Sequence, residues 1–172
     1  MDGAHTADRL VDALAGYSLA HKINPEEFRP IRLDVLLRAA LAKLAPAIGQ
    51  QGGEVTYDPL PRVAGDSDRL VQLFEHLIRN ALEHRGEAAP RVRVTVQDEG
   101  AGVHRFTIRD NGPGVEAGDL ERIFLPFERR HGSGAGLGLA ACRAIVEAHG
   151  GRIWAESGPG LVVCFTLPAA AE

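Results

Sequence analysis

Two glycine-rich stretches, separated by a short charged segment, are the parts of this chain whose residue types could do chemistry. The first, Asp110-Asn111-Gly112-Pro113-Gly114, follows an alternating apolar pattern that predicts a strand. A carboxylate at a strand end can accept a hydrogen bond, and the glycines Gly112 and Gly114 let backbone lie close to a bound ligand. These residues indicate a site that binds a hydrogen-bond donor, such as the edge of a base.

The second stretch carries four glycines at alternate positions directly before a predicted helix: Gly132, Gly134, Gly136 and Gly138. The first N–H groups of a helix have no partner inside it and the helix dipole is positive there, so this end suits an anion such as phosphate. The stretch matches neither G-x-x-x-x-G-K-[ST] nor G-x-G-x-x-G, since Leu137 and Leu139 stand where a third glycine would be. On the glycines alone, a phosphate cradle and a flexible loop before a core helix both stay open.

Four motifs taken together are far more specific than either glycine stretch. They are Asn80 in HLIRNALEH, Asp110 in DNGPG, Phe124 and Phe127 in IFLPFER, and the sequence GAGLGLA. Their order and spacing are those of the N, G1, F and G2 boxes. Over residues 31–168 the chain resembles the ATP-binding domain of sensor histidine kinases, phytochrome-type kinases in particular, within the superfamily that also holds gyrase, Hsp90 and MutL.

The resemblance implies a role for each matched residue. Asp110 would accept a hydrogen bond from the adenine amino group, directly or through water, and Asn80 would coordinate Mg²⁺ through its side-chain oxygen. The other residues that would surround ATP are Gly112, Gly114, Phe127, Arg129, Arg130, Gly134, Gly136, Leu137 and Gly138. The backbone from Gly134 to Gly138 would hold phosphates, and Arg129 or Arg130 would pair with the β- or γ-phosphate. For each arginine singly, a solvated charge run is an equal alternative. Phe124 and Phe127 are expected to dock the loop between the two glycine stretches on the core, which is also the role that the resemblance implies.

Two positions depart from the pattern of the family. His76 stands where related kinases usually carry Asn and where ATP-hydrolysing members carry a general-base Glu. A neutral imidazole can contact metal or water, and a purely structural role is its alternative. Glu83 stands where many relatives have a phosphate-contacting Lys. The segment between Gly114 and Gly132 is also short, which leaves little chain for a lid.

The phosphoacceptor of the family has no counterpart in these residues. None of the seven histidines is followed by the Glu-Leu-Arg and Thr-Pro of the H box. We therefore expect an ATP–Mg²⁺-binding catalytic domain that transfers the γ-phosphoryl group to a histidine on another domain, and no autophosphorylation by this chain alone. The implied partners are a histidine-containing dimerisation domain and a response regulator, within a dimeric full-length protein.

Two other functions stay open at this stage. One is a non-catalytic, degenerate kinase module that binds a nucleotide or a partner, which His76 and Glu83 would support. The other is a serine kinase of the anti-sigma-factor type, against which the phytochrome-like sequence argues.

The composition limits the number of domains, the kinds of partner and the setting that we expect for this chain. The 172 residues, 45% apolar and 24% charged, are enough for one globular domain, and the net charge of −4 gives no reason to expect nucleic acid or an anionic membrane as partner. No apolar run approaches the roughly 18 residues of a membrane span, and no signal-peptide pattern opens the chain, so we expect a cytoplasmic setting. Cys142 and Cys164 lack metal-ligand spacing and are expected in the core.

The periodicity predicts an α/β (α+β) two-layer sandwich, in which a mixed, mostly antiparallel sheet is covered on one face by three helices. Predicted helices cover 35–45, the stretch that Asp66 or Ser67 caps, and 138–149, which Gly150 and Gly151 would end as a C-cap. Predicted strands cover 28–34, 55–57, 91–96, 103–109, 153–155 and 161–167, with 58–65 as a loop, 157–160 as a hairpin turn and 168–172 as a frayed tail.

Residues 1–27 are expected to be an N-terminal helical segment and residues 28–172 the ATP-binding domain. Apolar residues at helical spacing predict an amphipathic helix over 7–20. By the resemblance, this helix would be the tail of a dimerisation helix; a poorly ordered extension is the alternative. We expect it, or a partner, to shield the other face of the sheet.

Overall fold

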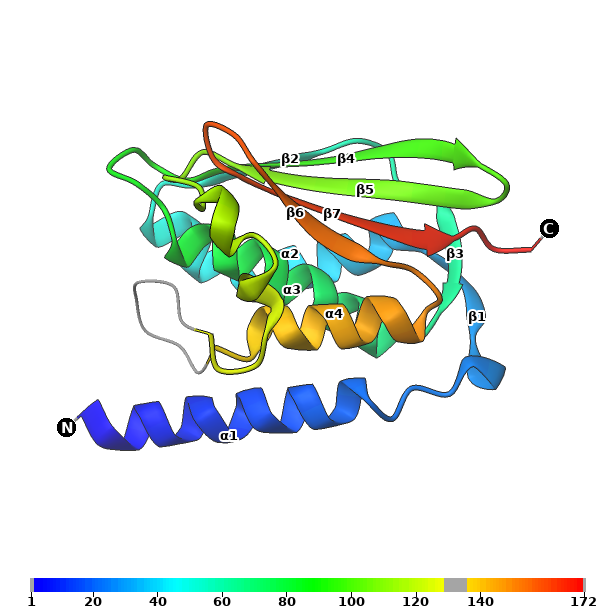
Figure 1. The fold of residues 1–172 in the computed structure, drawn as a ribbon, viewed down its shortest axis with the longest axis horizontal. Coiled ribbons are helices and arrows are strands. Elements are labelled where there is room, and N and C mark those ends of the chain that lie inside the picture. Colours follow the sequence, from blue (N-terminus) through cyan, green and yellow to red (C-terminus); the bar gives the residue numbers. More distant parts are fainter. Residues whose placement is uncertain (1, 129–135, 172) are drawn as a thin grey trace.

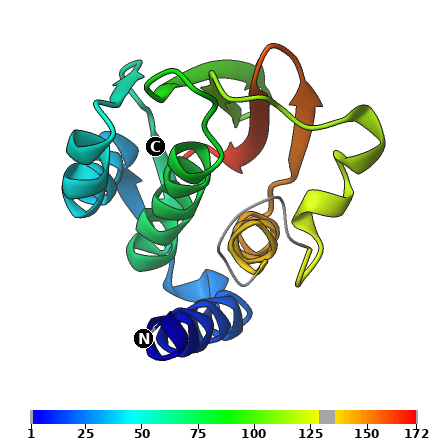
Figure 2. The ribbon, with the colours of Figure 1, turned by 90° about the vertical axis from the view of Figure 1, so that its left-hand side faces the viewer.

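The computed structural model describes residues 2–128 and 136–171 and shows an open five-stranded sheet with three helices packed on one face (Figures 1 and 2). The strands follow the order β2-β4-β5-β7-β6. They are β2 (Glu54–Tyr57), β4 (Arg91–Gly100), β5 (Val103–Asp110), β6 (Ile153–Ser157) and β7 (Leu161–Pro168). β2 pairs with β4 in parallel and the other neighbours are antiparallel, which confirms the mixed, mostly antiparallel prediction.

Three helices cover this face because each carries an apolar stripe. They are α2 (Leu33–Gln50), α3 (Ser67–Glu83) and α4 (Gly138–Ala148). In the core, Phe106 stacks on Phe165 with ring centroids 5.1 Å apart, and Phe74 of α3 meets Phe165 edge-on at 6.2 Å. Cys142 and Cys164 are buried and unpaired, as the sequence predicts.

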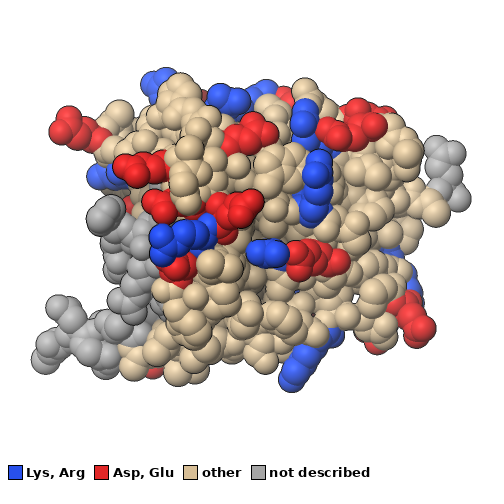
Figure 3. Space-filling view, in the orientation of Figure 1, with Lys and Arg blue, Asp and Glu red and all other residues tan. Residues whose placement is uncertain are grey.

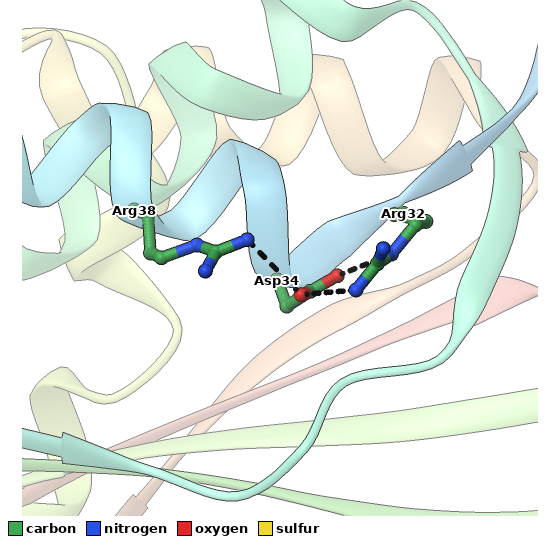
Figure 4. A network of polar contacts seen from close by, with 3 residues as sticks. All are labelled: Arg32, Asp34 and Arg38. Carbon is green, nitrogen blue, oxygen red and sulfur yellow. Dashed lines mark hydrogen bonds and ion pairs between the residues drawn. The ribbon is translucent and has the colours of Figure 1, made fainter.

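Helix boundaries follow local chemistry at two of the three covering helices. The side chain of Asp66 caps α3 by accepting a hydrogen bond from the Arg69 N–H at 3.1 Å, as expected. α2 has no side-chain cap, but Asp34 in its first turn binds Arg32 and Arg38 with N–O distances of 2.9 and 3.4 Å (Figure 4). A carboxylate there also complements the helix dipole.

Several boundary predictions are wrong. The N-terminal helix begins at Asp2 and not at residue 7, and β4 runs to Gly100 and not to residue 96. α2 continues past Pro46 to Gln50, since the turns beyond the proline still pack on the core. The predicted loop over 58–65 contains β3 (Arg62–Gly65), which pairs with β1 (Arg29–Arg32) in a second, two-stranded sheet. The tail is not frayed up to its last described residues, because Ala169 N–H donates to Gly102 O at 2.8 Å and Ala170 N–H to Arg62 O at 3.3 Å.

The N-terminal helix α1 (Asp2–Ala20) lies on the helix layer, next to α4, and not on the other face of the sheet (Figures 1 and 2). The expectation that it shields that face is therefore wrong. Alternation along the strands places polar side chains such as Thr56, Arg93 and Arg109 on the other face, which offers an apolar helix little to bury against.

The exposed surface carries charges of both signs. Figure 3 shows Lys and Arg side chains interspersed with Asp and Glu over the face in view. Within residues 2–128 and 136–171, no helix combines the length and the apolarity that a bilayer crossing requires.

Candidate functional site

The last residue of β5, Asp110, is held by two backbone groups from different segments. Its Oδ1 accepts hydrogen bonds from Gly112 N–H at 2.9 Å and from Leu161 N–H, at the start of β7, at 3.0 Å. No described residue makes a hydrogen bond to its other oxygen, Oδ2. The carboxylate is thus fixed in direction and keeps an acceptor for an incoming donor.

Glycines pack closely around this carboxylate. A β-carbon at Gly112 would lie 2.5 Å from His84 O, and one at Gly160 would lie 2.1 Å from Asp110 O. Gly114 has φ of +76°, a conformation that favours glycine. Gly160 was missed by the sequence reasoning, which assigned the Ser157–Gly160 stretch to a turn; nothing in a turn motif indicates that it abuts Asp110.

On α3, Asn80 lies one turn after His76 and beside the buried stripe that includes Leu77 and Ala81. Its side chain is half-buried and has no hydrogen-bond partner among the residues that the structure describes. An amide oxygen in that setting can serve a cation. The described residues contain no cluster of three His, Cys, Asp or Glu side chains that could hold a metal. A Mg²⁺ ion at Asn80 would therefore take its other ligands from water and from a bound anion, which is this ion's usual preference.

His76 of α3 lies next to the N-terminus of α4. Its Nε2 lies 3.2 Å from the Gln72 amide nitrogen, and its Nδ1 lies 3.7 Å from the position of a β-carbon built on Gly138. Desolvation, helped by the positive charge of Arg79, lowers the pKa of His76 to about 4. The imidazole is therefore neutral at pH 7.

The start of α4 has the properties expected of an anion site. The helix begins at Gly138, and the residue before it, Leu137, is buried and provides no side-chain cap. The first N–H groups of α4 are therefore not occupied by a capping side chain. Arg129, Arg130, Gly132 and Gly134, which the sequence assigns to the same phosphate region, lie outside the described residues.

The segment that leads to α4 is anchored in two ways. Phe124 is buried in the core, as predicted, and Phe127 N–H donates to Gly136 O at 2.8 Å. The prediction that the Phe127 side chain also docks on the core is wrong, because this side chain is 63% exposed. Its φ of +64° turns the backbone and directs the ring outward; Gly136 has φ of +71°.

A hollow of about 280 Å³ opens on the polar face of the sheet, and its lining includes Asp110 and Asn111 at the end of β5. Arg91, Arg93 and Arg109 line it, and Arg93 is ion-paired with Asp58. Because alternate residues of β4 point to opposite faces, the arginines face away from the helices that carry Asn80 and Gly138. Asn80 and Gly138 therefore lie on the helix side of the sheet, whereas Asp110 also borders the hollow.

Several known proteins are similar to this chain in sequence or in fold. Cyanobacterial phytochrome A of Nostoc sp. (strain PCC 7120) is 37% identical over 179 residues, which cover 98% of this chain and 22% of that protein. The structure of full-length ShkA in complex with AMPPNP superposes with a TM-score of 0.80 at 28% identity, over 95% of this chain and 36% of ShkA. The catalytic domain of histidine kinase ThkA gives 0.73 at 31% identity, over 83% of this chain and 95% of that domain.

The chain thus spans about a fifth of the length of the curated relatives it matches, such as this phytochrome. The sequence profile described as histidine kinase-, DNA gyrase B-, and HSP90-like ATPase matches residues 65–171, which include α3, the Asp110 loop and α4. The match spans more than half of the chain, and the solved structures that it resembles include the sensor histidine kinase MprB and the catalytic domain of histidine kinase ThkA. This chain belongs to the histidine kinase-, DNA gyrase B- and HSP90-like ATPase family, in the form found in sensor histidine kinases.

Proposed function

We propose that this chain binds ATP with Mg²⁺ and is the catalytic domain that transfers the γ-phosphoryl group of ATP to a histidine on another domain. The observation that carries the proposal is the Asp110 carboxylate. Its Oδ1 is held by Gly112 and Leu161, and its Oδ2 remains available to accept from the adenine amino group. The similar kinase ShkA was solved with AMPPNP, an ATP analogue.

The remaining site residues take the roles that the resemblance implies. Asn80 provides an amide oxygen for Mg²⁺, which neutralises charge on the phosphates when bound. Gly136, Leu137 and Gly138 present the start of α4 to the phosphates. The other proposed contacts are Gly112, Gly114, Phe127, Arg129, Arg130 and Gly134.

The acceptor histidine belongs to another domain. His149, for example, is buried with both ring nitrogens engaged: Nε2 accepts from Asp66 N–H at 3.0 Å, and Nδ1–H donates to Ile145 O at 2.7 Å. We propose a histidine-containing dimerisation domain and a response regulator as partners, in a cytoplasmic setting and a dimeric full-length protein. The similar kinase ThkA has been solved in complex with response regulator protein TrrA. Residues 1–27 would link the catalytic domain, residues 28–172, to the acceptor domain.

Calorimetry with ATP and GTP, each with and without Mg²⁺, tests the binding step. We expect ATP to bind more tightly than GTP, because Asp110 accepts a hydrogen bond and guanine presents a carbonyl where adenine presents its amino group. We expect Mg²⁺ to strengthen ATP binding. Equal affinity for ATP and GTP would contradict the role of Asp110, and ATP binding that is indifferent to Mg²⁺ would contradict the role of Asn80.

A non-catalytic module is the second candidate, favoured by His76 and Glu83. It predicts the same preference for ATP but no transfer of phosphate to any acceptor domain. The anti-sigma type of serine kinase predicts acid-stable phosphoserine on a partner. The chemical stability of the phosphorylated product therefore separates these candidates.

A further inference from the structure

A chain of hydrogen bonds runs along one face of α3 and ends at His76. Arg69 Nη1 donates to Gln72 Oε1 at 2.7 Å, and the other end of that amide, Gln72 Nε2, lies 3.2 Å from His76 Nε2. The guanidinium has only donors, so it fixes which end of the Gln72 amide is the oxygen. Reversal of the amide would bring its NH₂ group against the arginine.

This series of hydrogen bonds determines the tautomer of the His76 imidazole. Since Gln72 presents an N–H to His76 Nε2, that nitrogen must be the unprotonated acceptor. A neutral imidazole carries its single proton on the other nitrogen, so Nδ1 bears the hydrogen. The lowered pKa of His76 agrees with a neutral ring.

The Nδ1–H group faces the start of α4. A β-carbon on Gly138 would lie 3.7 Å from Nδ1. Among the described residues, the hydrogen bond of the His76 ring is the one that Nε2 makes with Gln72. The uncapped N–H groups at the start of α4 border the same space. Donors from two helices thus converge where an anionic oxygen would satisfy both.

Helix α1 closes the other side of the Gln72 amide. A β-carbon at Gly16 would lie only 2.6 Å from Gln72 Nε2 and 4.0 Å from His76 Nε2. The amide is therefore confined between α1 and α3, with little room to take another orientation. A larger residue at position 16 would have to displace the Gln72 amide.

We propose that His76 is a positioning residue that donates a hydrogen bond from Nδ1 to a phosphate oxygen of the bound nucleotide, and that Gln72 sets the tautomer that makes this possible. The inference rests on the proposed nucleotide site and adds a side-chain donor to its backbone donors. It also gives a role to the imidazole at the position where relatives usually carry Asn. The δ-nitrogens of Asn and His lie the same number of bonds from the backbone, so either residue can present an N–H there.

Two substitutions remove this donor in different ways. His76→Leu removes the ring. Gln72→Glu keeps the contact with Arg69 but replaces the N–H donor with a carboxylate acceptor. We expect the imidazole proton to move to Nε2, where it can donate to this carboxylate, so that Nδ1 carries no hydrogen. His76→Asn restores a donor and serves as the conservative control. Adenosine, which lacks phosphate, is the ligand control.

The experiment measures the affinity of the 172-residue chain for ATP and for adenosine by calorimetry, and the tautomer of His76 by ¹⁵N NMR without nucleotide. We expect His76→Leu and Gln72→Glu each to weaken ATP binding about tenfold, the effect of one hydrogen bond to a charged group, and to leave adenosine binding unchanged. We expect His76→Asn to stay within about threefold of the natural chain. The NMR spectrum of the natural chain should show the imidazole proton of His76 on Nδ1. The spectrum of Gln72→Glu should show this proton on Nε2.

Three results would overturn the inference. Unchanged ATP affinity in His76→Leu would exclude a phosphate contact, and a natural chain with its proton on Nε2 would exclude the donor. An equal loss of ATP and adenosine binding would show that His76 only supports the fold. If the natural chain binds ATP and the variants match it, this inference fails alone; if it binds no ATP, the proposed function fails with it.

Discussion

At the scale of single residues, the same side-chain chemistry is used in different ways according to which atoms are already satisfied. His149 and His76 both carry the proton on Nδ1, but His149 uses both nitrogens inside the fold and stacks on Phe28 with centroids 4.5 Å apart. In His76 the nitrogen Nδ1 is not used inside the described part of the fold, and it faces Gly138. Asp110 shows the same division, since one oxygen maintains the loop and the other is available to a ligand.

The role of Asp110 is tested by Asp110→Asn. The amide retains one oxygen for the loop but presents an NH₂ group toward the adenine amino group. We expect ATP binding to weaken by about 1.5–3 kcal/mol, the range for a hydrogen bond to a charged group. Calorimetry of the two proteins measures the difference, with a thermal unfolding curve to verify that the variant is folded. An unchanged affinity would remove Asp110 from the adenine site.

The neutral state of His76 predicts how stability depends on pH. Folding lowers its pKa from the ordinary 6.5 to about 4, so the unfolded chain takes up this proton first as the pH falls. The free energy of unfolding should be highest above pH 6.5 and should decrease as the pH drops toward 4. Desolvation also lowers the pKa of His149, which adds to the same trend.

Urea unfolding at a series of pH values measures this effect. His76→Leu should show a shallower decrease between pH 6.5 and 4 than the natural chain, because one of the two histidines is gone. Parallel curves for the two proteins would mean that His76 titrates alike in the folded and unfolded states.

At the scale of elements, the sequence was most informative where a local signal decides the structure. The Asp66 cap predicts the start of α3, and Gly150 with φ of +78° ends α4 as expected, with Gly151 N–H donating to Val146 O at 3.0 Å. The strand β3 was missed because four residues carry little pattern and their partner, β1, comes from a distant segment. The exposure of Phe127 was missed because a positive φ at a phenylalanine leaves no signature in the sequence.

The turn between β6 and β7 offers a matched test of the close packing around Asp110. A β-carbon at Gly160 would meet the Asp110 backbone oxygen at 2.1 Å, whereas one at Gly158 has its nearest neighbour at 3.7 Å. Gly160→Ala must therefore displace rigid backbone, and we expect it to cost about 1–3 kcal/mol of stability and to weaken ATP binding. Gly158→Ala should change stability by less than about 0.5 kcal/mol.

Chemical denaturation and ATP titration of both variants provide the comparison. Because the two glycines share one turn, a general effect of alanine on the turn would appear in both. Equal behaviour of the two variants would show that the packing of Gly160 on Asp110 is not what maintains the site.

At the scale of the whole molecule, the layers explain which surfaces are available. The sheet, the helix layer and α1 are stacked in that order, so the polar face of the sheet stays uncovered by any described element (Figure 1). Leu10, Val11, Leu14 and Leu19 of α1 are between 39% and 63% exposed. The packing of α1 on α4 could not be predicted from its amphipathic pattern, which shows that one side is buried but not against which partner.

The central claim, phosphoryl transfer to a histidine on another domain, is tested most directly by mixing this chain with a separate dimerisation domain that carries the acceptor helix, in the presence of γ-labelled ATP. We expect acid-labile label on the acceptor domain and none on this chain, with transfer that requires Mg²⁺ and is lost in Asn80→Ala. High protein concentration is needed because the two domains are not covalently linked. Tight ATP binding with no label on the cognate acceptor would contradict the account, as would acid-labile label on this chain itself.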